Sequence, residues 1–322
     1  MIIVTGGAGF IGSNLVRALN ARGRDDILIV DNLHHGRKFR NLIDCNWLDY
    51  MDKDEFLEHI QWGTEVPDGI EAIFHLGACT NTTEQDGRHL MRNNYSYSKA
   101  VLRYCMERNI RLIYASSASV YGAGRKFAET REHEAPLNAY GFSKFAFDQH
   151  VRRQLARKDA PPVFGLRYFN VYGPRESHKG AMASVVWHFH RQVLEQGTVR
   201  LFCGGDGFAD GEQCRDFVHV DDVVAATLWF AQAGAPSGIY NVGTGRSQTF
   251  NEVARAVLSL HQRGEIEYIP FPDALRGSYQ SHTQADLTRL RAAGYTGVFK
   301  TVEEGVPAYL DWLRTRPEFV RA

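Results

Sequence analysis

A glycine-rich turn directly after the first apolar run constrains the fold more than any other feature of the sequence. Residues 2–5 are followed by GGAGFIG at residues 6–12, which places glycines at Gly6, Gly9 and Gly12. After a strand, the first such glycine permits a tight turn, the second lets the backbone approach a pyrophosphate, and the third lets a helix pack closely. The N-terminus of that helix offers unpaired N–H groups to phosphates. Asp31 closes the next apolar run, nineteen residues after Gly12, so this unit predicts dinucleotide binding.

Apolar runs and amphipathic helical patterns alternate along the chain after this unit. Continuous apolar runs separated by amphipathic helical patterns predict an α/β fold, a Rossmann-type doubly wound parallel sheet covered on both faces. The expected strands are 2–5, 27–30, 72–75, 112–115 and 163–168, and the expected helices are 12–22, 95–108 and 140–155. After about residue 172 the rhythm changes, with helices expected at 182–195, from 250 and at 302–314, and short strands at 199–202, 216–220, 239–242 and 266–269. We therefore expect a dinucleotide-binding domain at 1–172, with returning segments from about 215–245, and mainly a smaller α/β substrate-binding lobe at 173–322.

Charge and composition exclude several classes of function. The 322 residues carry a formal net charge of zero, which predicts no global attraction to nucleic acid or to an anionic membrane. We see no secretory signal and no apolar stretch near the roughly 18 residues that a membrane helix needs. The five cysteines are scattered without a Cys-x-x-Cys pair, and the histidines do not have the spacing of metal ligands. These features predict no metal site, no disulfide framework and a reduced, cytoplasmic setting.

A Tyr-x-x-x-Lys pair carries the chemical argument. Tyr140 and Lys144 are four residues apart, so on a helix they share one face. An ammonium beside a phenol favours the phenolate and lowers its pKa, which allows the tyrosine to take a proton from an alcohol. A core tyrosine followed by a surface lysine is the alternative. Ser116 disfavours that alternative, because it follows the 112–115 run, where the carboxyl end of a strand faces the cofactor crevice and can donate to the same substrate oxygen.

In this order, Ser116, Tyr140 and Lys144 resemble the triad of the short-chain dehydrogenases/reductases, and their spacing resembles the extended branch of that family. Dehydratases of the branch carry an acidic residue directly after the serine or threonine. Here the next residues are Ser117 and Ala118, so the resemblance does not extend to dehydration.

A longer match points to one group within the branch. The segment RYFNVYGPRESHKG at 167–180, together with 1–12, 114–121, 136–144, 283–287 and 290–295, resembles the ADP-L-glycero-D-manno-heptose 6-epimerases, essentially from end to end. The resemblance implies inversion at C6″ of ADP-D-glycero-D-manno-heptose by transient oxidation and re-reduction with tightly bound NADP, in the synthesis of lipopolysaccharide inner-core precursors. It also implies a homo-oligomer, commonly a pentamer, and a second catalytic base at Lys179.

The same resemblance assigns the remaining site residues. Cofactor contacts would be Gly6, Gly9, Phe10, Ile11, Gly12, Asp31, Asn32, Lys38, Lys53, Leu76, Gly77, Ala78, Cys79, Thr80, Asn93, Lys144, Val171 and Lys179. Substrate contacts would be Ser116, Asn170, Ala181, His188, Phe202, Cys203, Gly204, Gly205, Arg215 and Tyr279. The chain departs from the family at Leu76, where many relatives have glutamate, at Ala181, which replaces a serine, and in a longer loop at 204–214.

Several alternatives stay open from the residues alone. Asp31 at the end of the second strand favours NAD, whereas Arg37 and Lys38 in the next loop could hold the 2′-phosphate of NADP. The family resemblance favours NADP. The competing functions are a UDP-hexose 4-epimerase or another sugar-nucleotide enzyme of the extended branch, a one-way reductase, and a non-enzymatic dinucleotide sensor.

Overall fold

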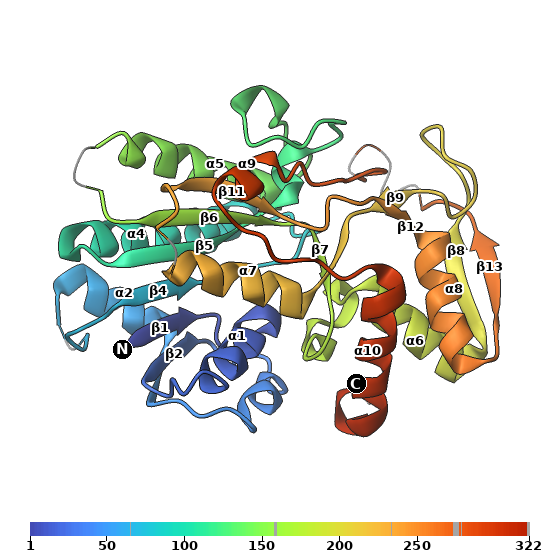
Figure 1. Cartoon of the computed structure of the whole chain (residues 1–322), viewed down its shortest axis with the longest axis horizontal. Coiled ribbons are helices and arrows are strands. Elements are labelled where there is room, and N and C mark those ends of the chain that lie inside the picture. The colour runs from blue at the N-terminus through green and yellow to red at the C-terminus, as the bar shows by residue number, and fades with distance from the viewer. Residues whose placement is uncertain (65, 158–159, 233, 273–276, 278, 321–322) are drawn as a thin grey trace.

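A seven-stranded parallel sheet forms the centre of the computed structural model, which describes residues 1–64, 66–157, 160–232, 234–272, 277 and 279–320. The strand order is β11-β6-β5-β4-β1-β2-β3 (Figure 1). The strands are β1 (Ile2–Thr5), β2 (Ile27–Asp31), β3 (Asp49–Asp52), β4 (Ala72–His75), β5 (Arg111–Ser117), β6 (Val163–Tyr168) and β11 (Gly238–Val242). This topology confirms the predicted doubly wound α/β fold.

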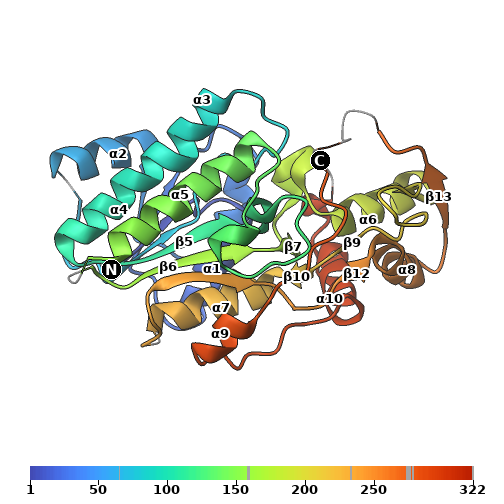
Figure 2. The same cartoon turned by 90° about the horizontal axis from the view of Figure 1, so that it is seen from above.

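Helices cover both faces of the sheet. One face carries α1 (Phe10–Asn20) and α7 (Val220–Gln232), and the other carries α2 (Lys53–Trp62), α4 (Tyr97–Arg108) and α5 (Ala139–Leu155) (Figure 2). Successive side chains of a strand point to opposite faces. Val4 therefore packs with Leu15 of α1, whereas its neighbour Ile3 packs with Val101 of α4 and Phe147 of α5. Two apolar cores explain why the strands read as continuous apolar runs.

The second lobe lies beyond the carboxyl end of the sheet and has a core of its own. It contains α6 (Val185–Gln196), α8 (Phe250–His261) and α10 (Val302–Thr315) beside the parallel pair β8 (Thr198–Phe202) and β13 (Glu265–Ile269) (Figure 1). Trp187, Val253 and Leu310 are buried together there. Two short pairs, β7 (Asn170–Tyr172) with β10 (Phe217–His219) and β9 (Cys214–Arg215) with β12 (Gln248–Thr249), lie between this core and the sheet.

Short elements complete the described chain. They are α3 (Gly87–Leu90), α9 (Thr288–Ala292), the π-helix η2 (Met91–Ser96), and the 3₁₀ helices η1 (Lys38–Leu42), η3 (Ala118–Tyr121), η4 (Arg131–His133), η5 (Ser177–Met182) and η7 (Pro317–Phe319). No helix within the described residues is long and apolar enough to cross a membrane.

Three elements of the main layer, β3, α2 and α7, were not predicted from the sequence. Strand β3 reads Asp-Tyr-Met-Asp and lies at the edge of the sheet, where only partial burial removes the apolar signal of a central strand. Helix α7 begins directly after β10, and its first turn carries Asp221 and Asp222. The sequence analysis predicted the strand before it but no helix.

A buried carboxylate fixes α5 on the sheet. Asp148 of α5 accepts hydrogen bonds from Tyr114 and Ser116 of β5, each at 2.9 Å, and from Arg167 Nε of β6, also at 2.9 Å. Arg167 is fully buried and also pairs with Glu134 in the segment before α5. A buried charge is tolerated only when it is paired and hydrogen-bonded, so this set determines how α5 sits over β5 and β6.

We expect Asp148→Ala to lower the free energy of unfolding by about 3–5 kcal/mol, because the change leaves Arg167 short of a buried counter-charge. Urea denaturation followed by circular dichroism measures this loss. The control is Asp311→Ala, which removes an exposed ion pair with Arg314 and should cost under about 1 kcal/mol. Equal losses in the two variants would contradict the role given to Asp148.

Candidate active site

The glycine turn forms a cradle at the carboxyl ends of β1 and β4. Gly6 has a φ of +69°, and a Cβ there would lie 2.7 Å from the backbone nitrogen of Gly77. A Cβ on Gly12 would collide with the carbonyl oxygen of Gly6, and one on Gly9 would lie 3.0 Å from the same oxygen. Only glycine therefore lets the turn and the start of α1 approach so closely. The first N–H groups of α1 have no partner within the helix and fit a pyrophosphate, so the residues suit the predicted dinucleotide.

Asp31 is buried at the end of β2, and both of its carboxylate oxygens have partners. Oδ2 accepts a hydrogen bond from the Ala8 backbone N–H at 2.9 Å, and Oδ1 pairs with the Lys38 ammonium. Lys38 also donates to the carbonyl oxygen of Asn32 at 3.0 Å. The structure thus brings these three predicted cofactor residues together, with a cation beside the carboxylate.

The π-helix η2 brings two asparagines to the segment that follows β4. Lys53 donates to Asn93 Oδ1 at 3.3 Å, which joins two predicted cofactor contacts. Asn94 was not predicted, yet its buried amide brackets Cys79: Oδ1 accepts from the Cys79 N–H at 2.8 Å, and Nδ2 donates to the Cys79 carbonyl at 2.9 Å. The 3.6-residue period of an α-helix does not predict a π-helix. The sequence signal for Asn94 was that a second amide side chain directly follows Asn93.

The structure corrects the position of the site serine. Ser116 is buried and donates to Asp148 at 2.9 Å, so its hydroxyl faces the interior on the α5 side of the sheet. It is Ser117 whose hydroxyl hydrogen-bonds Tyr140, and this bond lowers the pKa of the phenol. The structure therefore does not bring Ser116 to Tyr140, because neighbouring strand residues point to opposite sides and β5 extends to Ser117 rather than ending at 115.

The expected effect of Lys144 on Tyr140 also needs correction. Burial raises the pKa of Tyr140 above its usual value, and the hydrogen bond from Ser117 opposes that rise only in part. Burial lowers the pKa of Lys144 to about 8, although the charge of Asp148 acts in the opposite direction. Lys144 Nζ donates to the carbonyl oxygen of Ala115 at 2.9 Å. Desolvation disfavours the charged form of both groups, which outweighs the attraction that the spacing predicted.

Lys179 reaches the glycine turn from the other side. It lies in η5, where Gly180 adopts a φ of +54°. The Lys179 Nζ lies 5.3 Å from the centroid of the Phe10 ring, so the structure brings two predicted cofactor contacts together. Burial lowers the pKa of Lys179, while the buried carboxylate of Glu176 raises it.

Arg215 is a buried cation among the predicted substrate contacts. Its guanidinium lies 4.7 Å from the centroid of the Tyr279 ring and 5.6 Å from that of Phe250, and it donates to the Cys214 carbonyl at 3.1 Å. Phe202 lies beside Tyr279, with ring centroids 6.3 Å apart. Two aromatic faces hold the planar fork in place, an arrangement that suits the paired oxygens of a phosphate group.

Further contacts connect this substrate side to the Rossmann layer. Gln280, next to Tyr279, donates to the carbonyl oxygen of Gly122 at 2.7 Å, directly after η3. Asn170 Oδ1 accepts a hydrogen bond from Thr283 Oγ1 at 3.3 Å. The sequence analysis identified neither Gln280 nor Thr283, because the long-range pairing that gives them a role leaves no local pattern.

Further predicted contacts lie in three places. Ala181 is exposed in η5, and its backbone hydrogen-bonds the half-buried His188 side chain of α6, so these two residues lie together. Cys203, Gly204 and Gly205 follow β8, where the Cys203 N–H donates to the Ile269 carbonyl at 2.8 Å. Val171 is half-buried in β7.

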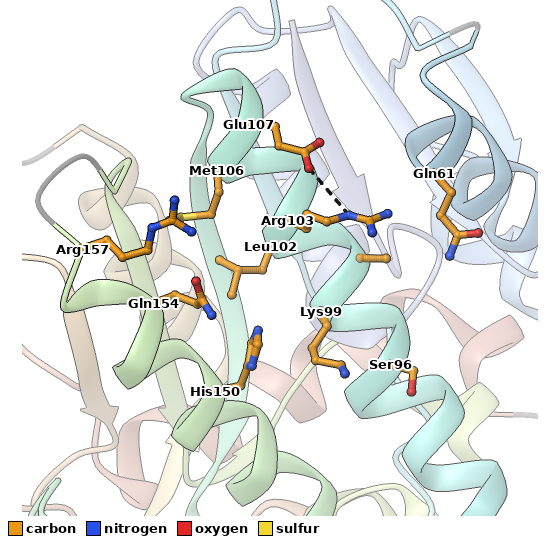
Figure 3. A pocket seen from close by; sticks show the side chains of 11 residues that line it. Gln61, Ser96, Lys99, Leu102, Arg103, Met106, Glu107, His150, Gln154 and Arg157 are labelled. Atoms are coloured by element: carbon orange, nitrogen blue, oxygen red, sulfur yellow. Dashed lines mark ion pairs between the residues drawn. The ribbon is translucent and has the colours of Figure 1, made fainter.

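A hollow of about 620 Å³ lies elsewhere, among α2, α4 and α5 (Figure 3). Lys99, Arg103, His150 and Arg157 are among its lining residues. It contains none of the predicted site residues, and the glycine turn does not line it. We therefore place the site at the strand ends and not in this hollow. In the part of the chain that the structure describes, no group of three or more His, Cys, Asp or Glu side chains could hold a metal ion.

Comparison with known proteins agrees with this geometry. The NAD dependent epimerase/dehydratase family matches residues 2–243. The ADP-L-glycero-D-manno-heptose-6-epimerase of Alkalilimnicola ehrlichii is 59% identical over 317 residues, which cover 98% of each chain. The Helicobacter pylori enzyme of the same name has a solved structure that is 30% identical, with a TM-score of 0.84 over 97% of this chain and 96% of that one. A Thermotoga maritima UDP-glucose 4-epimerase is 29% identical, with a TM-score of 0.81 and 98% of each chain covered. These likenesses confirm the resemblance that the sequence motifs indicated.

We expect Gly12→Ala to reduce the amount of dinucleotide retained by the purified protein at least tenfold, because the new methyl group would displace the turn from the start of α1. Absorbance of the dinucleotide released on denaturation measures the loss. Gly234→Ala is the control, since a Cβ there meets no atom within 4 Å. Full retention by the Gly12 variant would show that the turn does not hold the phosphates.

Proposed function

The chain belongs to the NAD dependent epimerase/dehydratase family, and on that premise we propose that it inverts C6″ of ADP-D-glycero-D-manno-heptose to give the L-glycero-D-manno form. The observation that supports the proposal is that two separate titratable side chains lie beside predicted cofactor contacts. Tyr140 of α5 interacts with Ser117 and Cys79, and Lys179 lies over the ring of Phe10. The likeness to heptose epimerases along nearly the whole chain supports the choice of sugar.

Inversion of an unactivated secondary alcohol explains why two such groups are needed. A bound nicotinamide dinucleotide would supply reversible hydride acceptance, so that C6″ could lose its hydride and regain it on the opposite face of the resulting carbonyl. The carbonyl group has to present its other face between these two events, so its oxygen occupies two positions. Each position needs its own group to take and return the hydroxyl proton.

Tyr140 serves one of these positions. Its phenol exchanges the proton with the sugar hydroxyl, and Ser117 donates a hydrogen bond to the same reacting oxygen. Burial raises the pKa of Tyr140, and before the sugar binds the hydrogen bond from Ser117 lowers it and favours the phenolate. Lys144, four residues further along α5, is held by the Ala115 carbonyl.

Lys179 serves the other position. A lysine accepts a proton only as the neutral amine, and burial lowers the pKa of Lys179 in the direction that favours this form. Glu176 acts against the shift and keeps the protonated form within reach, as a residue that must both accept and donate requires.

The site residues support NADP over NAD. Asp31 already accepts from the Ala8 N–H, and its charge is paired with Lys38. The carboxylate is therefore less repulsive to a 2′-phosphate, and Lys38 supplies a cation at the place where that group would lie. On the substrate side we assign the pyrophosphate to Arg215, because its guanidinium is buried between Tyr279 and Phe250.

The competing functions fit less well. A UDP-hexose 4-epimerase shares the Tyr140 chemistry but has no evident need for Lys179. A dinucleotide sensor needs neither Tyr140 nor Lys144, and a one-way reductase consumes free cofactor, whereas an epimerase shows no net turnover of it.

The proposal includes a cytoplasmic setting, in agreement with the five free cysteines, and a homo-oligomer of pentameric size by family resemblance.

We expect Lys179→Ala to lower kcat for inversion of ADP-D-glycero-D-manno-heptose by roughly 10²–10⁴-fold, since one of the two acid/base groups is removed. NMR of the product sugar measures the rate. Tyr140→Phe should fall in the same range, while Lys126→Ala, an exposed lysine before η4, should keep the full rate. A Lys179 variant that inverts the heptose normally would favour 4-epimerase chemistry on another sugar.

We expect Lys38→Ala to weaken retention of NADP about tenfold to a hundredfold and to leave NAD binding equal or tighter, because Asp31 then becomes free for a ribose 2′-hydroxyl. Titration of the apoprotein with each dinucleotide gives the two Kd values. Arg37→Ala removes a cation from the same loop and should change the ratio less. An unchanged ratio in the Lys38 variant would contradict the assignment of the 2′-phosphate site.

A further inference from the structure

The hydroxyl of Ser117 receives two hydrogen bonds from one residue of the turn that follows β5. Ser119 donates to Ser117 Oγ through its backbone N–H at 3.2 Å and through its own hydroxyl at 2.9 Å. Ser117 thereby caps η3, and both serines are half-buried. The contact is local, but it acts on the hydroxyl that faces Tyr140.

A count of hydrogen atoms shows what these contacts do. A serine hydroxyl has one hydrogen to donate and two lone pairs with which to accept. Both lone pairs of Ser117 are taken by Ser119, so its single hydrogen is left for a partner outside the turn. In the structure that partner is Tyr140.

We propose that Ser119 is a positioning residue that commits Ser117 to donate its hydrogen toward the reacting oxygen of the sugar. This inference rests on the proposed function, in which Ser117 assists Tyr140. Without the Ser119 hydroxyl, Ser117 keeps one free lone pair and can accept a hydrogen bond from the substrate alcohol or from Tyr140. The hydrogen is then no longer directed to the oxygen on which negative charge develops.

The surrounding turn is fixed by other contacts, so the two hydroxyls can be tested separately from the backbone. A Cβ on Gly141 of α5 would lie 2.8 Å from the Ser119 carbonyl oxygen, which shows how closely the turn packs beside Tyr140. From the substrate lobe, Gln280 donates to the carbonyl oxygen of Gly122 at the end of the turn. Removal of one hydroxyl from Ser119 leaves these contacts in place.

The test measures inversion of ADP-D-glycero-D-manno-heptose by NMR in the holoenzyme and in five variants. We expect Ser119→Ala to lower kcat roughly tenfold, with KM changed less than about twofold, and Ser119→Thr to restore most of the rate. Ser117→Ala should lower kcat at least as much, and the double variant should match Ser117→Ala alone. Ser259→Ala on α8, whose hydroxyl donates to the Ala256 carbonyl, is the matched control and should keep the full rate.

The pH dependence distinguishes orientation from simple damage. In the ligand-free protein the hydrogen bond from Ser117 lowers the pKa of Tyr140, so its misdirection in Ser119→Ala should move the rising limb of kcat/KM to higher pH. A structural defect would reduce the rate at every pH without this shift.

Two results would overturn the inference while leaving the proposed function intact. One is a tenfold loss from Ser119→Ala that persists in the Ser117→Ala background. The other is an unchanged rate and pH profile in Ser119→Ala when Ser117→Ala is impaired. If Ser117→Ala itself keeps the full kcat, the inference fails with the role given to Ser117, and the proposed function fails only if Tyr140→Phe is also fully active.

Discussion

The buried pairing of Asp148 with Arg167 is the interaction on which the site depends. Asp148 ties α5 to β5 and β6, and the same helix carries Tyr140 and Lys144. Because Asp148 accepts the hydroxyl of Ser116, that serine faces inward and Ser117 is left to face the phenol. Loss of the carboxylate would therefore disturb the stability of the layer and the direction of the site serine together.

Desolvation sets the chemistry of the site more than close ion pairs do. Burial lowers the pKa of Lys144 and Lys179 and raises that of Tyr140, since it disfavours the charged form in each case. For Lys179 this shift favours the amine that a base requires. For Tyr140 it opposes the phenolate, which gives the hydrogen bond from Ser117, and therefore the residue that directs it, a larger share in the reaction.

Much of this arrangement could be predicted from the sequence, and the misses have a common cause. The glycine turn, Asp31 and the Tyr140–Lys144 spacing are local patterns, and local geometry determines what they can do. The sequence pattern predicted that β5 ends at residue 115, whereas the strand continues to Ser117. Adjacent side chains of a strand point to opposite faces of the sheet, so Ser116 and Ser117 face opposite sides. Asn94 was not predicted because a π-helix has no regular apolar periodicity, and β3 because an edge strand is only partly buried. Gln280 was not predicted because its contact joins the two lobes and leaves no local pattern.

By itself, the sequence determined the class of fold and predicted the dinucleotide turn and the Tyr140–Lys144 pair, because each follows from spacing within one or two adjacent elements. Lys179 was predicted only from the family resemblance. Only the tertiary structure decided which serine faces Tyr140, how strongly each group is desolvated, and that Lys179 returns to the ring of Phe10. These features depend on burial and on contacts between residues far apart in the chain. Such contacts form when separate layers pack, and no single segment encodes them.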